Sequence, residues 1–510
     1  MLPILLGTVA EQYILSIDQG TTSSRALVVA RDGNVAGMAK EPFRQIYPQP
    51  GWVEHDPLDI WRSTEAAIKG ALKDASAGIR DVAAIGITNQ RETLVAWNAA
   101  TGVPVSNAIV WQDRRTADIC DELRDAGHEE FIAKATGLSL DPYFTGTKLT
   151  WLLRSDPGLR ARAEAGEILA GTVDSWLMWK LTGGREGAAH VTDFTNASRT
   201  LLFNIRTGRW DDSLCALFEV PRAMLPKALP SRAAFGTTSK DVLGAAIPIT
   251  GVAGDQQAAL FGQACLRPGL AKCTYGTGAF LLSPAGNKAL LSEQGLLVSL
   301  GSNTGPKGPE YVLEGSIFSA GAVVEWLKEG LGLIAEPAES EALAQSVPDS
   351  GDVTFVPAFT GLGAPHWDPG ARAMITGITR GTRAGHIARA ALESIAFSTA
   401  DLLQAMNADL PEPVTELRVD GGASRNDLLL QMQADFAGMP VTRPANVETT
   451  AMGAAYLAGI QAGIWDGPEE VAGLWQPDRT FEPSMGAGER SERLSAWHEA
   501  IARARSRAAD

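Results

Sequence analysis

Short apolar runs alternate with helical patterns along the first half of the chain. Residues 82–88 and 107–111 have the length and apolar content of buried strands. Asp56 followed by Pro57 is typical of a helix start, because aspartate caps free backbone N–H groups and proline suits the first helical position. This alternation predicts an α/β fold.

The second half shows the same type of pattern. Apolar runs predict strands at residues 353–356 and 415–419. Helical periodicity predicts helices at 384–406, 424–437 and 449–460. A stretch rich in arginine, alanine and glutamate, 490–507, predicts a C-terminal helix with a solvated face.

The length of the chain predicts more than one domain. A chain of 510 residues exceeds one ordinary hydrophobic core, so we expect two domains with a boundary near residues 254–269 and a cleft between them. Residues 1–12 are expected to form an N-terminal extension. The apolar patch at 2–6 lacks the basic segment and the long apolar core of a secretion signal.

Composition excludes several classes of protein. A net charge of −15 argues against extensive contact with nucleic acid, and no apolar run reaches the length of a membrane span, so stable membrane insertion is not expected. The four cysteines have no CxxC spacing, so the sequence predicts neither a disulfide framework nor a zinc site. A reducing, cytoplasmic location fits this composition.

The run from Ile17 to Arg25 places a carboxylate, a glycine and hydroxyl groups directly after an apolar strand. Strands at 13–17 and 25–30 would make it a β-hairpin, whose tip directs backbone N–H groups outward. Such a tip can bind phosphate oxygens, and Asp18 can hold a hydrated Mg²⁺. An ordinary polar hairpin has a similar composition, so both interpretations stay open on this segment alone.

Three further glycine-containing turns follow predicted strands, at 254–257, 274–278 and 420–426. The second resembles the first hairpin, because hydroxyls flank a glycine that lets backbone amides approach a phosphate. Two such hairpins would clamp a triphosphate from both sides. In the third turn, Ser424 is either a simple helix cap or part of a glycine floor beneath an adenosine.

Two strand ends carry candidate chemistry. Asp255 follows the apolar residues 249–253 and is a candidate general base, since a phosphoryl acceptor must lose its hydroxyl proton. Arg91 and Glu92 follow the strand at 82–88 and place a basic, positively charged side chain beside an acidic one. A surface ion pair is the alternative for these two residues.

Other catalytic patterns are missing from the sequence. It contains no GxxxxGK[ST] loop, no GxSxG elbow and no HExxH motif. If the chain handles phosphate, it does so with a different fold.

Taken together, the motifs resemble the FGGY family of carbohydrate kinases, from Tyr13 to about Phe481. The matching stretches are DQGTTSSR (18–25), QIYPQPGWVEHDP (45–57), IGITNQRET (85–93), NAIVWQDRRT (107–116), DPYFTGTKLTWLL (141–153), GDQQAALFGQ (254–263), TYGTGAF (274–280), FTGLGAPHWDP (359–369) and RVDGGA (418–423). Within that family, GWVEHDP, NQRE and GDQQ are specific to the kinases that act on glycerol.

The resemblance implies two actin-like, ribonuclease-H-like domains with the active site in the cleft between them. It assigns residues 13–262 to an N-terminal domain that binds glycerol and phosphate, and residues 263–510 to a C-terminal domain that binds adenosine. The implied reaction is ATP-dependent phosphorylation of glycerol to sn-glycerol 3-phosphate, with Mg²⁺ near Asp18. By analogy with the family, we expect a homodimer or homotetramer.

Site residues are carried over position by position. Asp255 matches the catalytic base. The residues that match the glycerol site are Arg91, Glu92, Trp111, Tyr143, Asp255, Gln256 and Phe280. The residues that match the ATP site are Thr21, Thr22, Ser23, Arg25 and Thr277 for the phosphates, and Gly321, Gly422 and Asn426 for the adenosine.

Two departures from the family's pattern bear on regulation and nucleotide binding. Glu325 stands where many members have glutamine near the adenosine, and residues 243–247 lack the arginine with which some members bind an inhibitory bisphosphate. The competing functions are a kinase for another small polyol or ketose, such as erythritol or xylulose, and a non-catalytic actin-like nucleotide-binding module.

Overall fold

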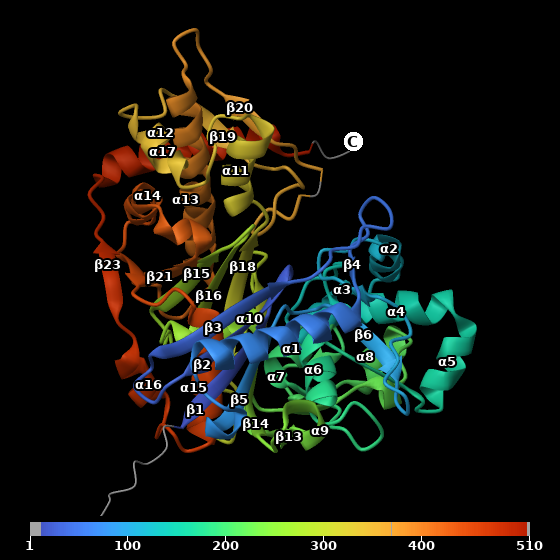
Figure 1. Cartoon of the computed structure of the whole chain (residues 1–510). Coiled ribbons are helices and arrows are strands. Elements are labelled where there is room, and N and C mark those ends of the chain that lie inside the picture. Colours follow the sequence, from blue (N-terminus) through green and yellow to red (C-terminus); the bar gives the residue numbers. More distant parts are fainter. Residues whose placement is uncertain (1–11, 369, 507–510) are drawn as a thin grey trace, which may run out of the picture. The chain divides into compact units, whose positions relative to one another are not determined.

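The structure of the chain, a computed structural model, describes residues 12–368 and 370–506. The N-terminal extension expected at 1–12 therefore lies, except for its last residue, outside the described residues. The chain forms two compact units (Figure 1). Unit 1 comprises the chain up to Gly262 with 299–309 and 450–474, and unit 2 comprises the remainder.

Unit 1 is built on a six-stranded sheet in the order β13-β14-β5-β1-β2-β3. The strands are β1 (Tyr13–Gln19), β2 (Ser23–Val29), β3 (Val35–Pro42), β5 (Val82–Asn89), β13 (Arg232–Thr237) and β14 (Pro248–Gly254). β1, β2 and β3 form an antiparallel meander, whereas β5 and β14 run parallel to β1.

Unit 2 contains a seven-stranded sheet in the order β17-β18-β16-β15-β21-β22-β23. Its strands are β15 (Leu270–Tyr275), β16 (Ala279–Gly286), β17 (Leu297–Leu300), β18 (Tyr311–Ile317), β21 (Glu416–Gly421), β22 (Val441–Pro444) and β23 (Pro477–Phe481). β15 and β18 flank β16 in antiparallel pairing, and β21 and β22 continue the sheet parallel to β15.

The two sheets therefore share one core order, in which an antiparallel meander of three strands is extended by two parallel strands from its first strand. Helices accompany both sheets, so the predicted two-domain α/β fold is confirmed. The shared order also agrees with the actin-like arrangement that the sequence resemblance implies.

The helix start at Asp56 is confirmed. The carboxylate of Asp56 accepts from the backbone N–H of Leu58, and α1 (Pro57–Asp74) begins with proline. Its buried face, which includes Trp61, packs on β2 and β3. A tryptophan cluster of Trp97, Trp176 and Trp179 completes this core.

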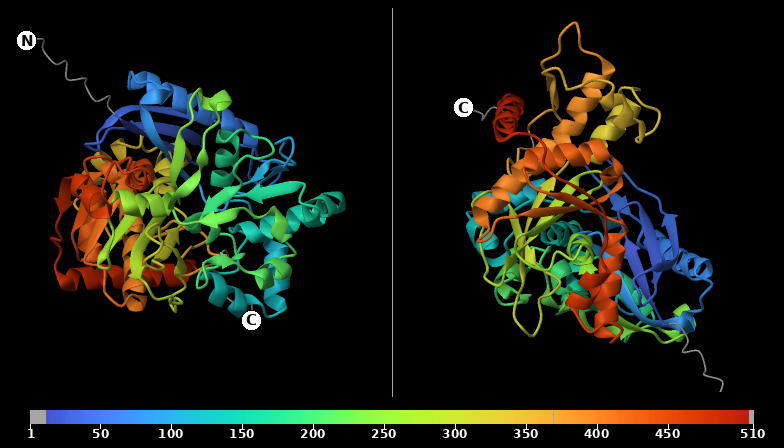
Figure 2. Two further views of the ribbon diagram at one scale, coloured as in Figure 1. Left: turned by 90° about the horizontal axis from the view of Figure 1, so that it is seen from below. Right: turned by 90° about the vertical axis from the view of Figure 1, so that its left-hand side faces the viewer.

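In unit 2, α13 (Ala384–Asp409) and α14 (Asp427–Ala437) lie side by side (Figure 1, Figure 2). Phe397 of α13 stacks on Phe436 of α14 with ring centroids 4.1 Å apart. No helix among residues 12–368 and 370–506 is long and apolar enough to cross a membrane.

The predicted C-terminal helix is present and has a solvated face. α17 spans Ala487–Ala504, and its opposite face is buried, with Trp497 only 1% exposed. The Trp497 ring stacks on Phe397 at 5.3 Å, and its Nε1 donates to Asp401 at 2.6 Å. Trp497 thus anchors the buried face of this helix together with Ala500, Ile501 and Ala504.

Helix α15 (Thr449–Gln461) lies unusually close to the sheet of unit 1. A Cβ atom added to Gly86 in β5 would come within 2.2 Å of the carbonyl oxygen of Ala454. One added to Gly251 in β14 would come within 2.3 Å of the nitrogen of Ala458. Both neighbours are backbone atoms that cannot turn aside, so these glycines set the distance between helix and sheet.

We predict that Gly251→Ala lowers the apparent stability of the chain by at least about 2 kcal/mol, because the added methyl group must push α15 away from β14. Gly473→Ala is the matched control, since position 473 lies in α16 (Pro468–Leu474) with no atom within 4 Å of the added Cβ. It should be neutral or slightly stabilising. Urea unfolding followed by tryptophan fluorescence measures both, and equal midpoints for the two variants would contradict the prediction.

Candidate active site

The hairpin predicted at the start of the chain is confirmed. β1 and β2 pair antiparallel, with Asp18 opposite Arg25, and the backbone N–H of Gly20 donates to the carbonyl of Ser23 at 3.0 Å. Thr22 at the tip is exposed, and Thr21 is half-buried. The hydroxyls and amides of this tip can therefore meet a ligand from solvent.

Gln90 supports the tip, a contact that sequence reasoning missed. The Gln90 backbone N–H donates to the Gln19 carbonyl at 2.7 Å, and its Nε2 donates to the Gly20 carbonyl at 3.1 Å. Gln90 is 1% exposed. The NQRE motif contains this residue, but the sequence does not reveal that it buttresses another strand's loop.

The carboxyl ends of three parallel strands meet at one edge of the unit 1 sheet. Asn89 at the end of β5 is in register with Gln19 of β1 and with Gly254 of β14. Ligands of open α/β sheets commonly bind at such an edge. Asp18, Arg91 and Asp255 lie at or directly beyond these three ends, so the fold itself brings them together.

Asp255 is the first residue of α10 (Asp255–Gly262). Its Oδ1 accepts from the Gln256 backbone N–H at 2.7 Å and lies 3.1 Å from Nε of Arg91. The side chain is 29% exposed, in contrast to Arg91 at 2%. The carboxylate is thus fixed on its inner side and open on the other, as a base that must reach a substrate hydroxyl requires.

Arg91 and Glu92 form no surface ion pair, so that alternative is wrong. Their side chains are 2% and 1% exposed, and Arg91 Nε lies 3.9 Å from Glu92 Oε1. Glu92 has a left-handed backbone with φ of 61°, which is strained for a side chain of this kind. A Cβ added to Gly254 would come within 2.7 Å of Arg91 Cδ, so any larger residue at position 254 would clash with the Arg91 side chain.

Trp111 contacts both the hairpin tip and Tyr143. Its Nε1 donates to Thr21 Oγ1 at 3.0 Å, and its ring meets the ring of Tyr143 edge-on at 5.7 Å. Tyr143 precedes α4 (Thr145–Ser155), whose Lys148 donates to the Glu92 carbonyl at 3.3 Å and to the Tyr143 carbonyl. Burial lowers the pKa of Lys148 to about 8.

The predicted site residues of the second half belong to unit 2. Thr277 is exposed at the tip of the hairpin between β15 and β16, and its carbonyl accepts from Ala320 at 2.9 Å and Ala322 at 3.0 Å. The loop is therefore hydrogen-bonded to the start of α11 (Gly321–Glu325). A Cβ added to Gly321 would come within 2.5 Å of the Gly276 carbonyl oxygen.

The turn at 420–426 is also placed beside this hairpin. Gly421 has φ of 88°, and a Cβ there would come within 2.3 Å of the Tyr275 carbonyl oxygen. Gly422 has open space around it, which suits a flat ligand surface. The helix cap is Asn426, which accepts from the Leu429 N–H at 2.9 Å, so the interpretation of Ser424 as the cap is wrong.

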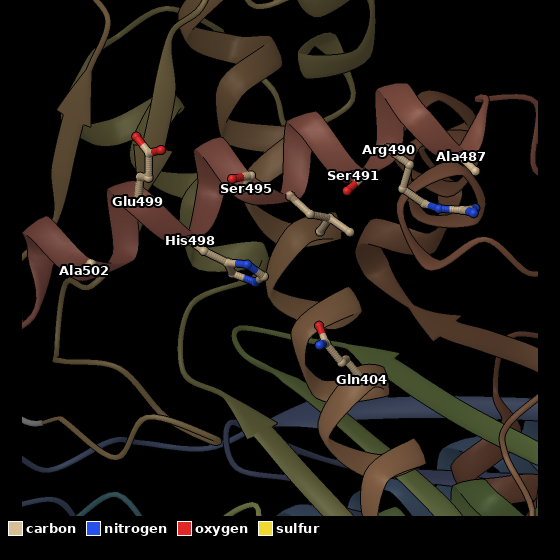
Figure 3. A pocket seen from close by; sticks show the side chains of 9 residues that line it. Gln404, Ala487, Arg490, Ser491, Ser495, His498, Glu499 and Ala502 are labelled. Carbon is tan, nitrogen blue, oxygen red and sulfur yellow. The ribbon is translucent and has the colours of Figure 1, made fainter.

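A surface hollow of about 640 Å³ lies elsewhere in unit 2, along α17 and Gln404 of α13 (Figure 3). None of the predicted site residues lines it. Its lining includes the oppositely charged Arg490 and Glu499 together with His498.

The residues around Asp18 fit a magnesium ion that is bound mainly by phosphate. Within residues 12–368 and 370–506, no group of three or more His, Cys, Asp or Glu side chains could hold a metal alone. Mg²⁺ often binds through one or two carboxylates together with waters and substrate phosphates. Asp18 supplies one carboxylate beside the hairpin tip, which is enough for that mode.

Comparison with known families matches both halves of the chain. Residues 13–262 match the N-terminal domain, and residues 271–462 the C-terminal domain, of the FGGY family of carbohydrate kinases.

Individual relatives cover nearly the whole chain. Glycerol kinase 2 of Thermotoga maritima is 56% identical over 96% of this chain and 98% of its own length. Glycerol kinase of Ralstonia nicotianae is 56% identical over 97% of this chain and 98% of its own. The crystal structure of Plasmodium falciparum glycerol kinase with ADP superposes with a TM-score of 0.89 at 36% identity, covering 98% and 99% of the two chains.

The environment of Asp18 yields a prediction about pH. Burial, opposed by Arg25 and reinforced by Asp255, raises the pKa of Asp18 from 3.8 to about 6. A raised carboxyl pKa means that the folded state holds this proton more tightly, so the stabilising contribution is present below about pH 4 and is lost as the pH rises through 6. At pH 7.5 the Asp18→Asn variant should then be more stable than the wild type, by at most about 3 kcal/mol.

The same variant should show no such gain at pH 4, where the wild-type carboxyl is already protonated. Thermal melts at the two pH values measure the difference. A gain of equal size at both pH values would show that packing, and not ionisation, distinguishes the variant.

Proposed function

This chain belongs to the FGGY family of carbohydrate kinases, and we infer that it transfers the γ-phosphoryl group of ATP to glycerol, forming sn-glycerol 3-phosphate and ADP. Relatives that are 56% identical over nearly the full length carry the name glycerol kinase. The structural observation that carries the inference is the buried Arg91–Glu92 pair beside the partly open carboxylate of Asp255.

We assign glycerol binding to a polar group and an apolar wall. Arg91, Glu92, Asp255 and Gln256 supply donors and acceptors for the hydroxyls, together with the hydroxyl of Tyr143. The aromatic rings of Trp111 and Phe280 suit the carbon face of the triol. A buried site of this kind discriminates strongly between acceptor substrates, because an acceptor with fewer matching hydroxyls leaves polar groups of the site unpaired.

We assign ATP binding to the two hairpins and the loops beside the second one. Thr21, Thr22, Ser23 and Arg25 from the first hairpin, with Thr277 from the second, contact the phosphates. Gly321, Gly422 and Asn426 border the adenosine. Asp18 would hold Mg²⁺, which neutralises charge on the phosphate oxygens. We place the functional domains at residues 13–262 and 263–510.

Asp255 acts as the general base in this proposal. Its carboxylate takes the proton of a primary hydroxyl of glycerol while the hydroxyl oxygen attacks the γ-phosphorus. The bond from the γ-phosphorus to the bridging oxygen breaks in line, and ADP leaves. Arg91 and the Gln256 N–H hold the base in place, so that the reacting oxygen finds the carboxylate already oriented.

We also propose a cellular location and an oligomeric state. A cytoplasmic location fits four free, buried cysteines, and a homodimer or homotetramer rests on analogy with the family. The alternative function is phosphorylation of another small polyol or ketose. It uses the same residues and differs from the proposed function only in the acceptor substrate.

An acceptor panel tests the function directly. ADP release is measured with glycerol, dihydroxyacetone, erythritol and xylulose at saturating ATP. We expect the kcat/KM for glycerol to exceed every other by at least tenfold. A higher value for xylulose or erythritol would establish the alternative, and ATP turnover that ignores every acceptor would indicate a non-catalytic module.

We predict that Asp255→Asn lowers kcat by about 10²- to 10⁴-fold and leaves the Kd for ATP within twofold of wild type, because the base acts in the transition state. Asp211→Asn is the control, since Asp211 caps α8 (Asp212–Leu217) and asparagine caps equally well. Its kcat should be unchanged. An ATP affinity that falls as far as kcat would mark Asp255 as a structural residue.

A further inference from the structure

A second buried arginine lies behind the proposed glycerol site. Arg199 follows the short helix α7 (Phe194–Ala197), and its side chain is completely buried. It is separated by 107 residues from Glu92, to which its side chain donates a hydrogen bond. Burying a guanidinium is costly unless charged and polar partners surround it, so these partners indicate its role.

The first partner is the carboxylate of Glu92. Arg199 Nε donates to Glu92 Oε1 at 2.5 Å, the same oxygen that lies 3.9 Å from Arg91 Nε. Glu92 also has a strained backbone, which surrounding contacts must maintain. The contact with Arg199 therefore sets which way this carboxylate points.

The second partner is the aromatic pair that leads into α4. The guanidinium carbon of Arg199 lies 5.5 Å from the ring centroid of Tyr143 and 5.2 Å from that of Phe144. At this distance a cation is attracted to the face of an aromatic ring. Arg199 thus contacts two side chains that come from separate parts of the chain and that we assign to glycerol.

We propose that Arg199 is a positioning residue for the acceptor: it fixes Glu92 and Tyr143 relative to each other, and so sets the affinity and selectivity for glycerol without touching it. This role rests on the proposed function. Because a small triol offers only a few hydroxyl groups for recognition, a displacement of about 1 Å in either side chain weakens binding. The hairpin tip lies one contact further away, because Trp111 packs on Tyr143 and donates to Thr21, so the effect on ATP binding should be much smaller than that on glycerol.

A purely structural role is the competing explanation, and the chain offers a matched control for it. Arg115 is equally buried, at 2% exposed, and pairs with Glu54 and Asp113 while stacking on Trp52 at 3.7 Å. None of these partners is assigned to a substrate. Arg115→Gln therefore removes a comparable buried ion pair from the same unit.

The experiment compares Arg199→Gln, Arg199→Lys and Arg115→Gln in the full-length enzyme. For Arg199→Gln we expect the KM for glycerol to rise at least tenfold, the KM for ATP to stay within twofold, and the preference for glycerol over dihydroxyacetone to fall. Arg199→Lys keeps the buried charge but loses the planar fork, so it should lie between Arg199→Gln and wild type. Arg115→Gln should lower the Tm and leave both KM values within twofold.

Several results would overturn the proposal. One is a folded Arg199→Gln enzyme whose KM for glycerol is unchanged, and another is an equal rise in both KM values. Failure of both Arg199 variants to fold would make the residue structural. A wild-type protein that phosphorylates no glycerol would reject the proposed function and this role with it, whereas the other results leave the function intact.

Discussion

Charges buried at the carboxyl edge of the unit 1 sheet constrain the rest of the site. Arg91, Glu92 and Arg199 are each at most 2% exposed, and Asp255 completes the group at 29%. Removing such charges from water is unfavourable unless each one meets an opposite charge in good geometry. The ends of β5 and β14 and the segment after α7 must therefore keep their relative positions, and the open oxygen of Asp255 depends on them.

That constraint accounts for local features that would otherwise be unfavourable. Glu92 occupies a left-handed backbone conformation, and Gly254 must lack a side chain because Arg91 passes it. Such strain persists only where surrounding contacts determine it, and it is concentrated at functional sites. Asp18 follows the same rule, since its pKa of about 6 indicates a carboxylate held where it is less stable than in water. A phosphate-bound cation beside it would relieve this cost.

Features that depend on neighbouring residues could be predicted from the sequence. The hairpin at Asp18, the cap at Asp56 and the position of Asp255 at a strand end follow from neighbouring residues, and the structure has all three. The roles of Gln90 and Arg199 depend on partners far along the chain, which no spacing reveals. The buried face of α17 was missed for the same reason, because Trp497 is buried only where Phe397 of another helix meets it.

The common strand order of the two sheets supports a shared use of their edges. In unit 1, the meander begins with a hairpin that carries Thr21, and the parallel strand beside it ends at Asn89, two residues before Arg91. In unit 2, the equivalent hairpin carries Thr277, and the equivalent parallel strand ends at Gly421, where Tyr275 and Gly421 are in register. Unit 1 places the buried Arg91–Glu92 pair directly beyond this edge. In unit 2 the buried carboxylate of Asp420 is taken up by hydrogen bonds from Gln263 and Thr449, and the turn after it presents glycines and an asparagine cap. An edge with charge suits the reacting hydroxyl and phosphate, and an edge of bare backbone suits a flat, uncharged base.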